Sequence, residues 1–265
     1  MIEAEPAAIL PLILAGLMAV GYCVLALRQR ARPQGWSGWR TGAFLAGCCA
    51  LALGLLPRLL PYPTGDFRKH MLQHLILGMI APLGLVLSAP MTLLLRTVCT
   101  QHGRALSHLL QSRALQVVAN PLSALALNFG GMAALYFTPL YGAMHRHQAL
   151  HAIVHIHFLA AGCLYTWVIA GPDPAPHRPS VPTRLLVLGV AVVLHSVLSQ
   201  LLYADLFVQV SAPAAQLHGG AEWMYYGGDL SEMLLAFALV TTWHPARRPT
   251  RRDPQASPPA KCLTV

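Results

Sequence analysis

Apolar residues gather along the chain into seven stretches, and short polar or proline-rich segments separate them. A helix of about 20 apolar residues is long enough to cross the hydrocarbon core of a membrane. The pattern therefore predicts an all-α, polytopic membrane helix bundle with seven transmembrane helices. We expect these helices at residues 7–27, 41–60, 70–95, 121–141, 150–171, 184–204 and 222–243.

The composition supports a membrane protein and excludes several soluble classes. Hydrophobic residues make up 55% of the 265 residues and charged residues only 10%, whereas soluble domains carry about 25% charged residues. So little polar surface excludes an ordinary soluble enzyme and a disordered protein. The formal charge of +9 does not indicate a nucleic-acid binder, because the basic residues are scattered between apolar stretches.

The basic residues also predict the orientation of the helices. If the spans alternate, 14 of the 18 Lys and Arg residues fall on one side, and the other side holds Arg58, Arg68, Lys69 and Arg146. Cytoplasmic loops carry the excess of Lys and Arg, so we expect the N-terminus outside and the C-terminus inside. Residues 1–243 then form the transmembrane domain, and residues 244–265 form a basic, proline-rich cytoplasmic tail that we expect to be disordered. Residues 97–120 are either an amphipathic helix in the cytoplasmic interface or a plain connector.

Two histidine pairs stand at the outer ends of two predicted spans. His70 and His74 begin the third span, and His151 and His155 begin the fifth. Residues four apart share one helix face, and both helices run from outside to inside, so the pairs should lie at matched depths. If the two faces meet, four imidazoles converge on a metal ion. The alternative is that these polar residues near helix ends only hydrogen-bond to water.

The ligand types in this region favour copper. Neutral imidazole binds copper, zinc, iron and nickel, and thioether sulfur favours monovalent copper. Met71 adjoins His70, and His218 lies near the start of the last span. We therefore expect copper, in its monovalent state, with Met71 and His218 as further ligands. Cys48 and Cys49 are interpreted as small apolar side chains, with soft metal ligation as the alternative.

Three more ionisable residues are predicted to lie at membrane depth. His195 falls about 13 Å below the outer end of the sixth span at 1.5 Å per residue, and Asp229 and Glu232 are three residues apart in the last span. Intramembrane ionisable residues are expensive and usually functional. Metal ligation, support of a ligating histidine and a proton relay all stay open for the two carboxylates. The structural alternatives are a histidine bonded to a backbone carbonyl or a hydroxyl, and carboxylates that lie in the interface.

The residues resemble those of a known family, the CtaG-type cytochrome c oxidase assembly factors. The segment His70-Met71-Leu72-Gln73-His74, followed by Pro82 and Pro90, is similar to the third helix of that family. A second match is to the fifth helix of the family and the loop that follows it. The residues that resemble this part are His151-x3-His155, Gly162, Trp167, Pro172 and Pro174. Asp205 and the Gly-Gly-x-x-Trp-Met stretch that ends at Met224 are similar to its last helix, although the order of Trp and Met and the position of Asp205 depart from the family pattern.

This resemblance covers about residues 40–243 and implies a function. It implies a multi-pass protein of the bacterial inner membrane that is not an enzyme. Such a protein binds copper at the periplasmic side and assists the metallation of a haem-copper oxidase. The implied partners are an oxidase subunit, a periplasmic copper donor and the lipid bilayer; a homodimer stays open, and no nucleic acid is expected.

Two other functions remain compatible with the residues themselves. Histidines that face each other from two helices hold haem in b-type cytochromes, because two imidazoles ligate the iron. A copper or proton transporter would instead use His195, Asp229 and Glu232 as a path. The sequence shows no internal repeat of the kind found in many transporters.

Overall fold

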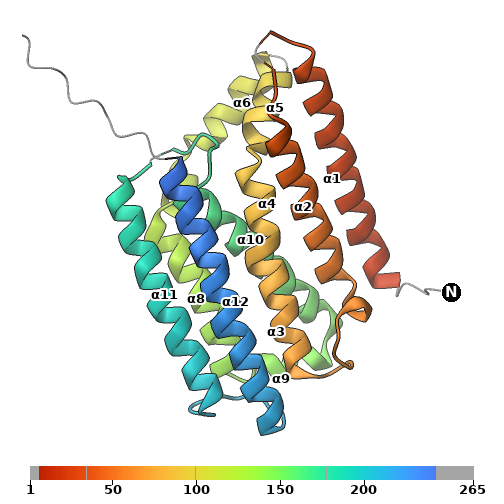
Figure 1. Ribbon diagram of the computed structural model, residues 1–265, viewed down its shortest axis with the longest axis vertical. Helices are drawn as coiled ribbons and strands as arrows, with labels where there is room; N and C mark the ends of the chain where they lie inside the picture. Colours follow the sequence, from red (N-terminus) through yellow and green to blue (C-terminus); the bar gives the residue numbers. More distant parts are fainter. Residues whose placement is uncertain (1–5, 34, 99, 177, 243–265) are drawn as a thin grey trace, which may run out of the picture.

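The protein is described here by a computed structural model that covers residues 6–33, 35–98, 100–176 and 178–242. The described chain is all-α, as predicted, and its long helices run side by side in one bundle (Figure 1). The predicted tail at residues 244–265 lies outside the described residues. The long single helices are α1 (Pro6–Arg30), α2 (Gly38–Leu55), α8 (Pro121–Phe137), α10 (Gln148–Ile169), α11 (Val181–Tyr203) and α12 (Ala214–Thr241).

Helical segments occupy all seven predicted positions, but fewer have the length and hydropathy of a membrane span. Within the described residues, five stretches meet both conditions: Leu10–Arg30, Gly38–Leu55, Phe67–Thr97, Gln148–Ile169 and Val181–Tyr203. Helix α8 is apolar but only 17 residues long, and α12 is 28 residues long but carries polar residues along its first half. The structure therefore supports a multi-pass membrane protein with five clear spans, and the count of seven and the orientation stay predictions.

The start of the last helix was predicted too late. Helix α12 begins at Ala214, directly after Pro213, and not at residue 222. Gly219 and Gly220 lie inside this helix. They let it approach α3 closely, because the side chains of Arg68 and Phe67 occupy the space where a Cβ atom of each glycine would lie. A polar stretch thus continues as helix because it packs against the start of the third helical segment.

The third helical segment is a composite of four pieces. These are α3 (Phe67–Leu75), a π-helical turn η2 (Ile76–Ile80), α4 (Ala81–Leu87) and α5 (Pro90–Thr97). Pro82 explains the π-turn, since a proline inside a helix lacks an N–H and its ring clashes with the carbonyl four residues earlier, here that of Gly78. The chain breaks again at Ala89, whose φ of 58° is left-handed, before Pro90 starts the last piece.

A distant loop stabilises the start of α5. The buried carboxylate of Asp173 accepts hydrogen bonds from the backbone N–H of Met91 at 3.0 Å and of Thr92 at 2.7 Å, and from the Thr92 hydroxyl at 2.6 Å. The first N–H groups of a helix have no partner within the helix, so Asp173 takes the place of a local N-cap. The loop after α10 is thereby fixed against the last piece of the third segment.

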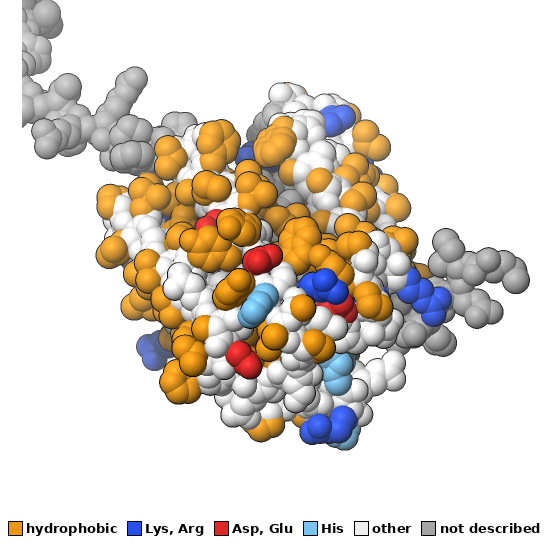
Figure 2. All heavy atoms as spheres, turned by 60° about the horizontal axis from the view of Figure 1, so that its bottom comes forward, with side chains coloured by type: hydrophobic (Ala, Val, Ile, Leu, Met, Phe, Trp, Pro, Cys, Tyr) orange, Lys and Arg blue, Asp and Glu red, His pale blue; other side chains and the backbone are white. Residues whose placement is uncertain are grey.

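The helices pack around two apolar clusters and expose apolar side chains on their outer faces. One cluster joins α8, α10, α11 and α12 to the third segment, and the other joins α1 and α2 to it. On the outside, Leu17, Leu186 and Phe237 are 62%, 68% and 69% exposed. Figure 2 shows apolar side chains over the flanks, while acidic, basic and histidine side chains appear on the end of the bundle where α3 begins. This distribution fits a lipid environment around the flanks.

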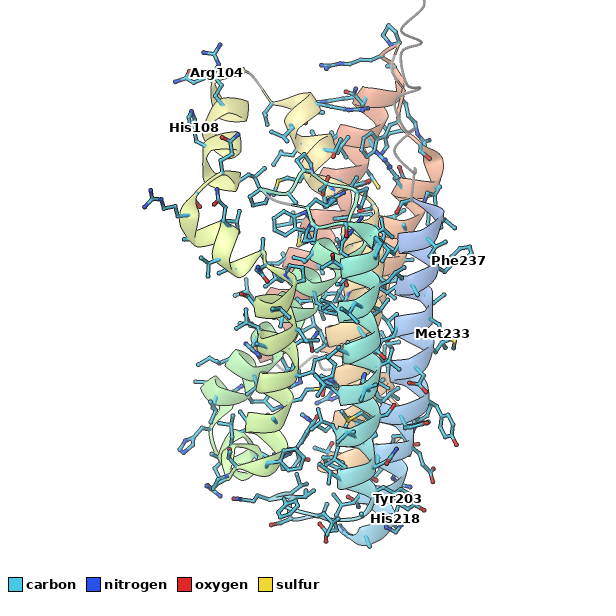
Figure 3. All side chains as sticks on the ribbon, turned by 90° about the vertical axis from the view of Figure 1, so that its left-hand side faces the viewer. Arg104, His108, Tyr203, His218, Met233 and Phe237 are labelled. Carbon is cyan, nitrogen blue, oxygen red and sulfur yellow. The ribbon has the colours of Figure 1, made fainter. Side chains whose placement is uncertain are left out.

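The segment between the third and fourth predicted spans is helical, as the first of the two alternatives predicted, and its place in the cytoplasmic interface stays a prediction. It forms α6 (Thr100–Leu110) and α7 (Arg113–Val118). Figure 3 shows α6 standing away from the bundle, with Arg104 and His108 pointing outward. The remaining short helices are η1 (Pro57–Leu59) and α9 (Leu140–Arg146).

Candidate functional site

The end of the bundle where α3 begins, which is the outer end in the predicted orientation, brings together histidines from α3 and α10. The ring centroids of His70 and His155 lie 6.3 Å apart, and those of His151 and His155 lie 4.3 Å apart. His70 and Met71 are buried, His155 is partly buried and His151 is exposed. We call His70, Met71, His151 and His155 the outer cluster. It contains four of the residues that the sequence singled out as metal ligands.

The predicted convergence of all four imidazoles was wrong in its register. His155 faces His70, and the residue opposite His74 is Phe158, whose ring centroid lies 4.4 Å from that of the imidazole. The faces of α3 and α10 do meet, but α10 is displaced by about one turn from the predicted alignment, so His74 lies below the outer cluster. Among the residues that the structure describes, no three His, Cys, Asp or Glu side chains are placed to hold one metal ion.

Two tyrosines that the sequence did not single out complete the outer cluster. The Tyr136 hydroxyl lies 3.4 Å from His70 Nε2 and 3.8 Å from Met71 Sδ. The buried Tyr141 ring packs edge-on against His70, with centroids 5.1 Å apart. Neither tyrosine lies on the two helices that carry the histidine pairs, so no spacing rule could indicate them.

The start of α3 is held by a local charge pair at the rim of the outer cluster. The buried Asp66 carboxylate accepts hydrogen bonds from the Arg68 backbone N–H at 2.9 Å and from its guanidinium at 2.6 Å. These hydrogen bonds stabilise the ionised form, so the pKa of Asp66 is held below its usual value although burial acts in the opposite direction. Asp66 is thus the N-cap of the helix that carries His70 and His74.

A small cavity of about 30 Å³ lies deeper in the bundle. His74 of α3, Tyr165 of α10, His195 of α11 and Glu232 of α12 all line it. His195 Nδ1 lies 3.3 Å from Glu232 Oε1, and both residues are buried. The partner of His195 is therefore the predicted acid of the last helix, and neither a backbone carbonyl nor a hydroxyl. We call these four residues the deep cluster.

The deep cluster leaves one polar atom of each of its members without a protein partner. These buried atoms are His74 Nδ1, Tyr165 OH, His195 Nε2 and Glu232 Oε2. Buried polar groups are normally hydrogen-bonded, and each exception needs a reason. Four exceptions around one cavity indicate that the cavity takes a polar or charged occupant.

Other predicted site residues lie apart from both clusters. His218 stacks on Tyr203 with ring centroids 4.3 Å apart, and Figure 3 shows this pair at the end of the bundle where α12 begins. Asp229 is partly buried on α12 and is not among the described residues that line the cavity. Cys48 lies in the apolar cluster of α1 and α2, and Cys49 is exposed.

Comparison with known proteins decides which family these features belong to. The family model described as cytochrome c oxidase caa3 assembly factor (Caa3_CtaG) matches residues 20–245. The chain belongs to this family. The resemblance seen in the histidine and proline pattern is thereby confirmed.

Relatives of this caa3 assembly factor family member occur in mycobacteria. Uncharacterised proteins of Mycobacterium bovis and Mycobacterium tuberculosis are each 32% identical to it over 248 residues, which is 86% of this chain and 37% of each relative. An uncharacterised protein of Mycobacterium leprae is 28% identical over 246 residues. The chain thus spans little more than a third of the length of the relatives it matches. No solved structure matches it.

Proposed function

We propose that this protein binds monovalent copper at the periplasmic side of the membrane and assists the metallation of a haem-copper oxidase. The observation that supports this best is the outer cluster, in which His70 and Met71 of α3 meet His155 and His151 of α10. Imidazole and thioether donors together suit monovalent copper. In the predicted orientation this cluster faces the periplasm, where a copper donor delivers its cargo.

Hydrogen bonding at the outer cluster supports a particular donor atom. His155 Nδ1 lies 2.8 Å from the His151 carbonyl oxygen, which can only accept, so Nδ1 carries the proton and Nε2 keeps a free lone pair. A ligating histidine typically uses its second nitrogen in this way. His155 Nε2 and the His70 imidazole, held by Tyr136, are the expected ligands, and the exposed His151 contributes less.

The proposal predicts that His70→Ala and His155→Ala reduce copper delivery. Each should lower the affinity for Cu(I) by at least about tenfold, since even outer-shell partners of a metal commonly account for that much. His151→Ala should have a smaller effect because its side chain is exposed. The measurements are Cu(I) binding to the purified protein in competition with a chromophoric chelator, and the copper content of the haem-copper oxidase from the same cells.

His157→Ala is the matched control on α10, because His157 Nε2 contacts the Leu127 carbonyl of α8 and does not face the outer cluster. An oxidase with full copper content in the His70/His155 double variant would contradict the proposal.

Visible absorption of the purified protein tests the haem alternative, since a b-type cytochrome has an intense Soret band. Copper uptake into sealed vesicles tests the transporter alternative.

A further inference from the structure

The deep cluster places two imidazoles and a carboxylate around one cavity. His195 Nδ1 donates a hydrogen bond to the Glu232 carboxylate, which leaves His195 Nε2 with a lone pair and without a protein partner. His74 Nδ1 and Glu232 Oε2 are also buried without protein partners, as is the Tyr165 hydroxyl. No Lys or Arg is among the described residues that line the cavity. This arrangement favours a cation as the occupant.

The neighbours of the two imidazoles hold them against the cavity. Gly228 of α12 lets His195 pack against the helix backbone, because a Cβ atom at this position would overlap the His195 ring. His74 is held from the other side by the Phe158 ring. Met79 and Met132 also line the cavity, and the Ser231 hydroxyl lies 3.5 Å from Met79 Sδ. Thioether side chains therefore line the same cavity as the two imidazoles.

We propose that the cavity is a second, intramembrane binding site for one Cu(I) ion, held between His74 Nδ1 and His195 Nε2. Glu232 orients His195 and balances the charge of the ion, and Met79 and Met132 supply soft donors nearby. This inference rests on the proposed function, because it gives the copper taken up at the outer cluster a protected place below it. The cavity is large enough for one ion or for about two water molecules, but far too small for haem.

The choice of copper follows from the donor set. Two imidazoles and a carboxylate by themselves would also suit a catalytic zinc ion, but Met79 and Met132 line the same cavity, and thioether sulfur favours monovalent copper. Monovalent copper is stable with two or three such ligands. His74 lies four residues after His70, so the deep site is about 6 Å further along α3 at 1.5 Å per residue. One helix therefore connects both sites.

The experiment is a Cu(I) titration of the purified full chain in detergent, with a chromophoric chelator as competitor. The wild type should bind two ions. His74→Ala and His195→Ala should each remove one, and the His70/His155 double variant should remove the other. Glu232→Gln, which keeps the shape of the side chain, should weaken the deep site by about 10- to 100-fold, as the loss of an outer-shell partner does elsewhere. The control His157→Ala should keep both ions.

Two further measurements leave every ligand of the deep site in place. Gly228→Ala should displace His195 and lose the deep ion with every donor still present. X-ray absorption of the His70/His155 double variant loaded with one Cu(I) should show imidazole nitrogen around the metal. This second measurement keeps the proposal falsifiable if His195→Ala fails to fold.

The outcomes separate the two proposals. One ion that is lost only in the outer variants would overturn the deep site and leave the proposed function standing, with the cavity then holding water. One ion that is lost only in the deep variants would support the deep site and contradict the outer cluster. A wild-type protein that binds no Cu(I) would overturn both.

Discussion

Asp66 links the start of α3 to pH through a single side chain. Its folded-state pKa is lowered, chiefly by the hydrogen bonds from Arg68. A carboxyl group with a lowered folded pKa stabilises the protein at pH values above its unfolded pKa of about 3.9. This contribution is lost as the pH falls through the lowered folded value. The capped start of α3 should therefore weaken in acid, and with it the position of His70.

We predict that Asp66→Asn melts at a lower temperature than the wild type at pH 7. The difference in melting temperature should shrink as the pH falls below about 4. The carboxyl group of the wild type is then increasingly protonated and, like the amide of the variant, carries no charge. Thermal melts of both proteins in detergent between pH 7 and pH 3 measure this. Asp205→Asn, at an exposed position after α11, is the control. A difference between wild type and Asp66→Asn that stays constant over the whole range would show that the charge has no part in it.

Single residues also show where prediction from the sequence stops. The residue types of both histidine pairs, of His195 and of Glu232 could be recognised, because i, i+4 spacing and ionisable groups in apolar stretches are visible in one dimension. The pairing of His155 with His70 could not, because the register between two helices depends on packing. The contact between His195 and Glu232 joins two helices, and support of a histidine was only one of several roles that the sequence left open for this carboxylate.

At the scale of helices, the crossing of α10 and the third segment depends on one glycine. A Cβ atom on Gly162 would overlap the Gly78 carbonyl oxygen in the π-turn η2. Small residues at such crossings let two helix backbones approach closely. The crossing lies beside the deep cavity, which both glycines line. The Pro82 that causes the π-turn was visible in the sequence, but the close approach to α10 was not.

We predict that Gly162→Ala destabilises the protein by about 1–3 kcal/mol, the usual cost of an extra methyl group in a packed interior. It should also lower copper binding at the deep site, because α10 must move away from His74. Gly189→Ala on α11 is the control, since a Cβ atom on Gly189 would have no other atom within 4 Å, and the stability of this variant should stay the same or rise. If Gly162→Ala melts at the same temperature as the wild type, the two helices can move apart at the crossing without loss of stability.

For the molecule as a whole, the open question is whether α8 and α12 cross the membrane. The 17 residues of α8 span about 26 Å and the 28 residues of α12 about 42 Å at 1.5 Å per residue, against a hydrocarbon core of about 30 Å. The hydropathy of α12 is lowered in part by Glu232, yet this residue is buried against His195 and does not face lipid. Mean hydropathy thus underestimates helices whose polar residues face the interior of the bundle.

Seven spans and five spans place the same three loops on opposite sides of the membrane. With seven spans, reporters fused after His147 and Ser211 are periplasmic and one after Ser180 is cytoplasmic. If α8 and α12 do not cross, all three reverse, and α10 then runs opposite to α3, which contradicts the contact of His70 with His155 at one end of the bundle. We predict the seven-span result, because Arg178 and Arg184 flank position 180 and basic residues mark the cytoplasmic side. A phosphatase that is active only in the periplasm measures this, with a fusion after Arg32 as the cytoplasmic control. A fusion at the C-terminus completes the test: periplasmic activity there would mean that only one of α8 and α12 crosses, and would contradict the predicted orientation of the tail.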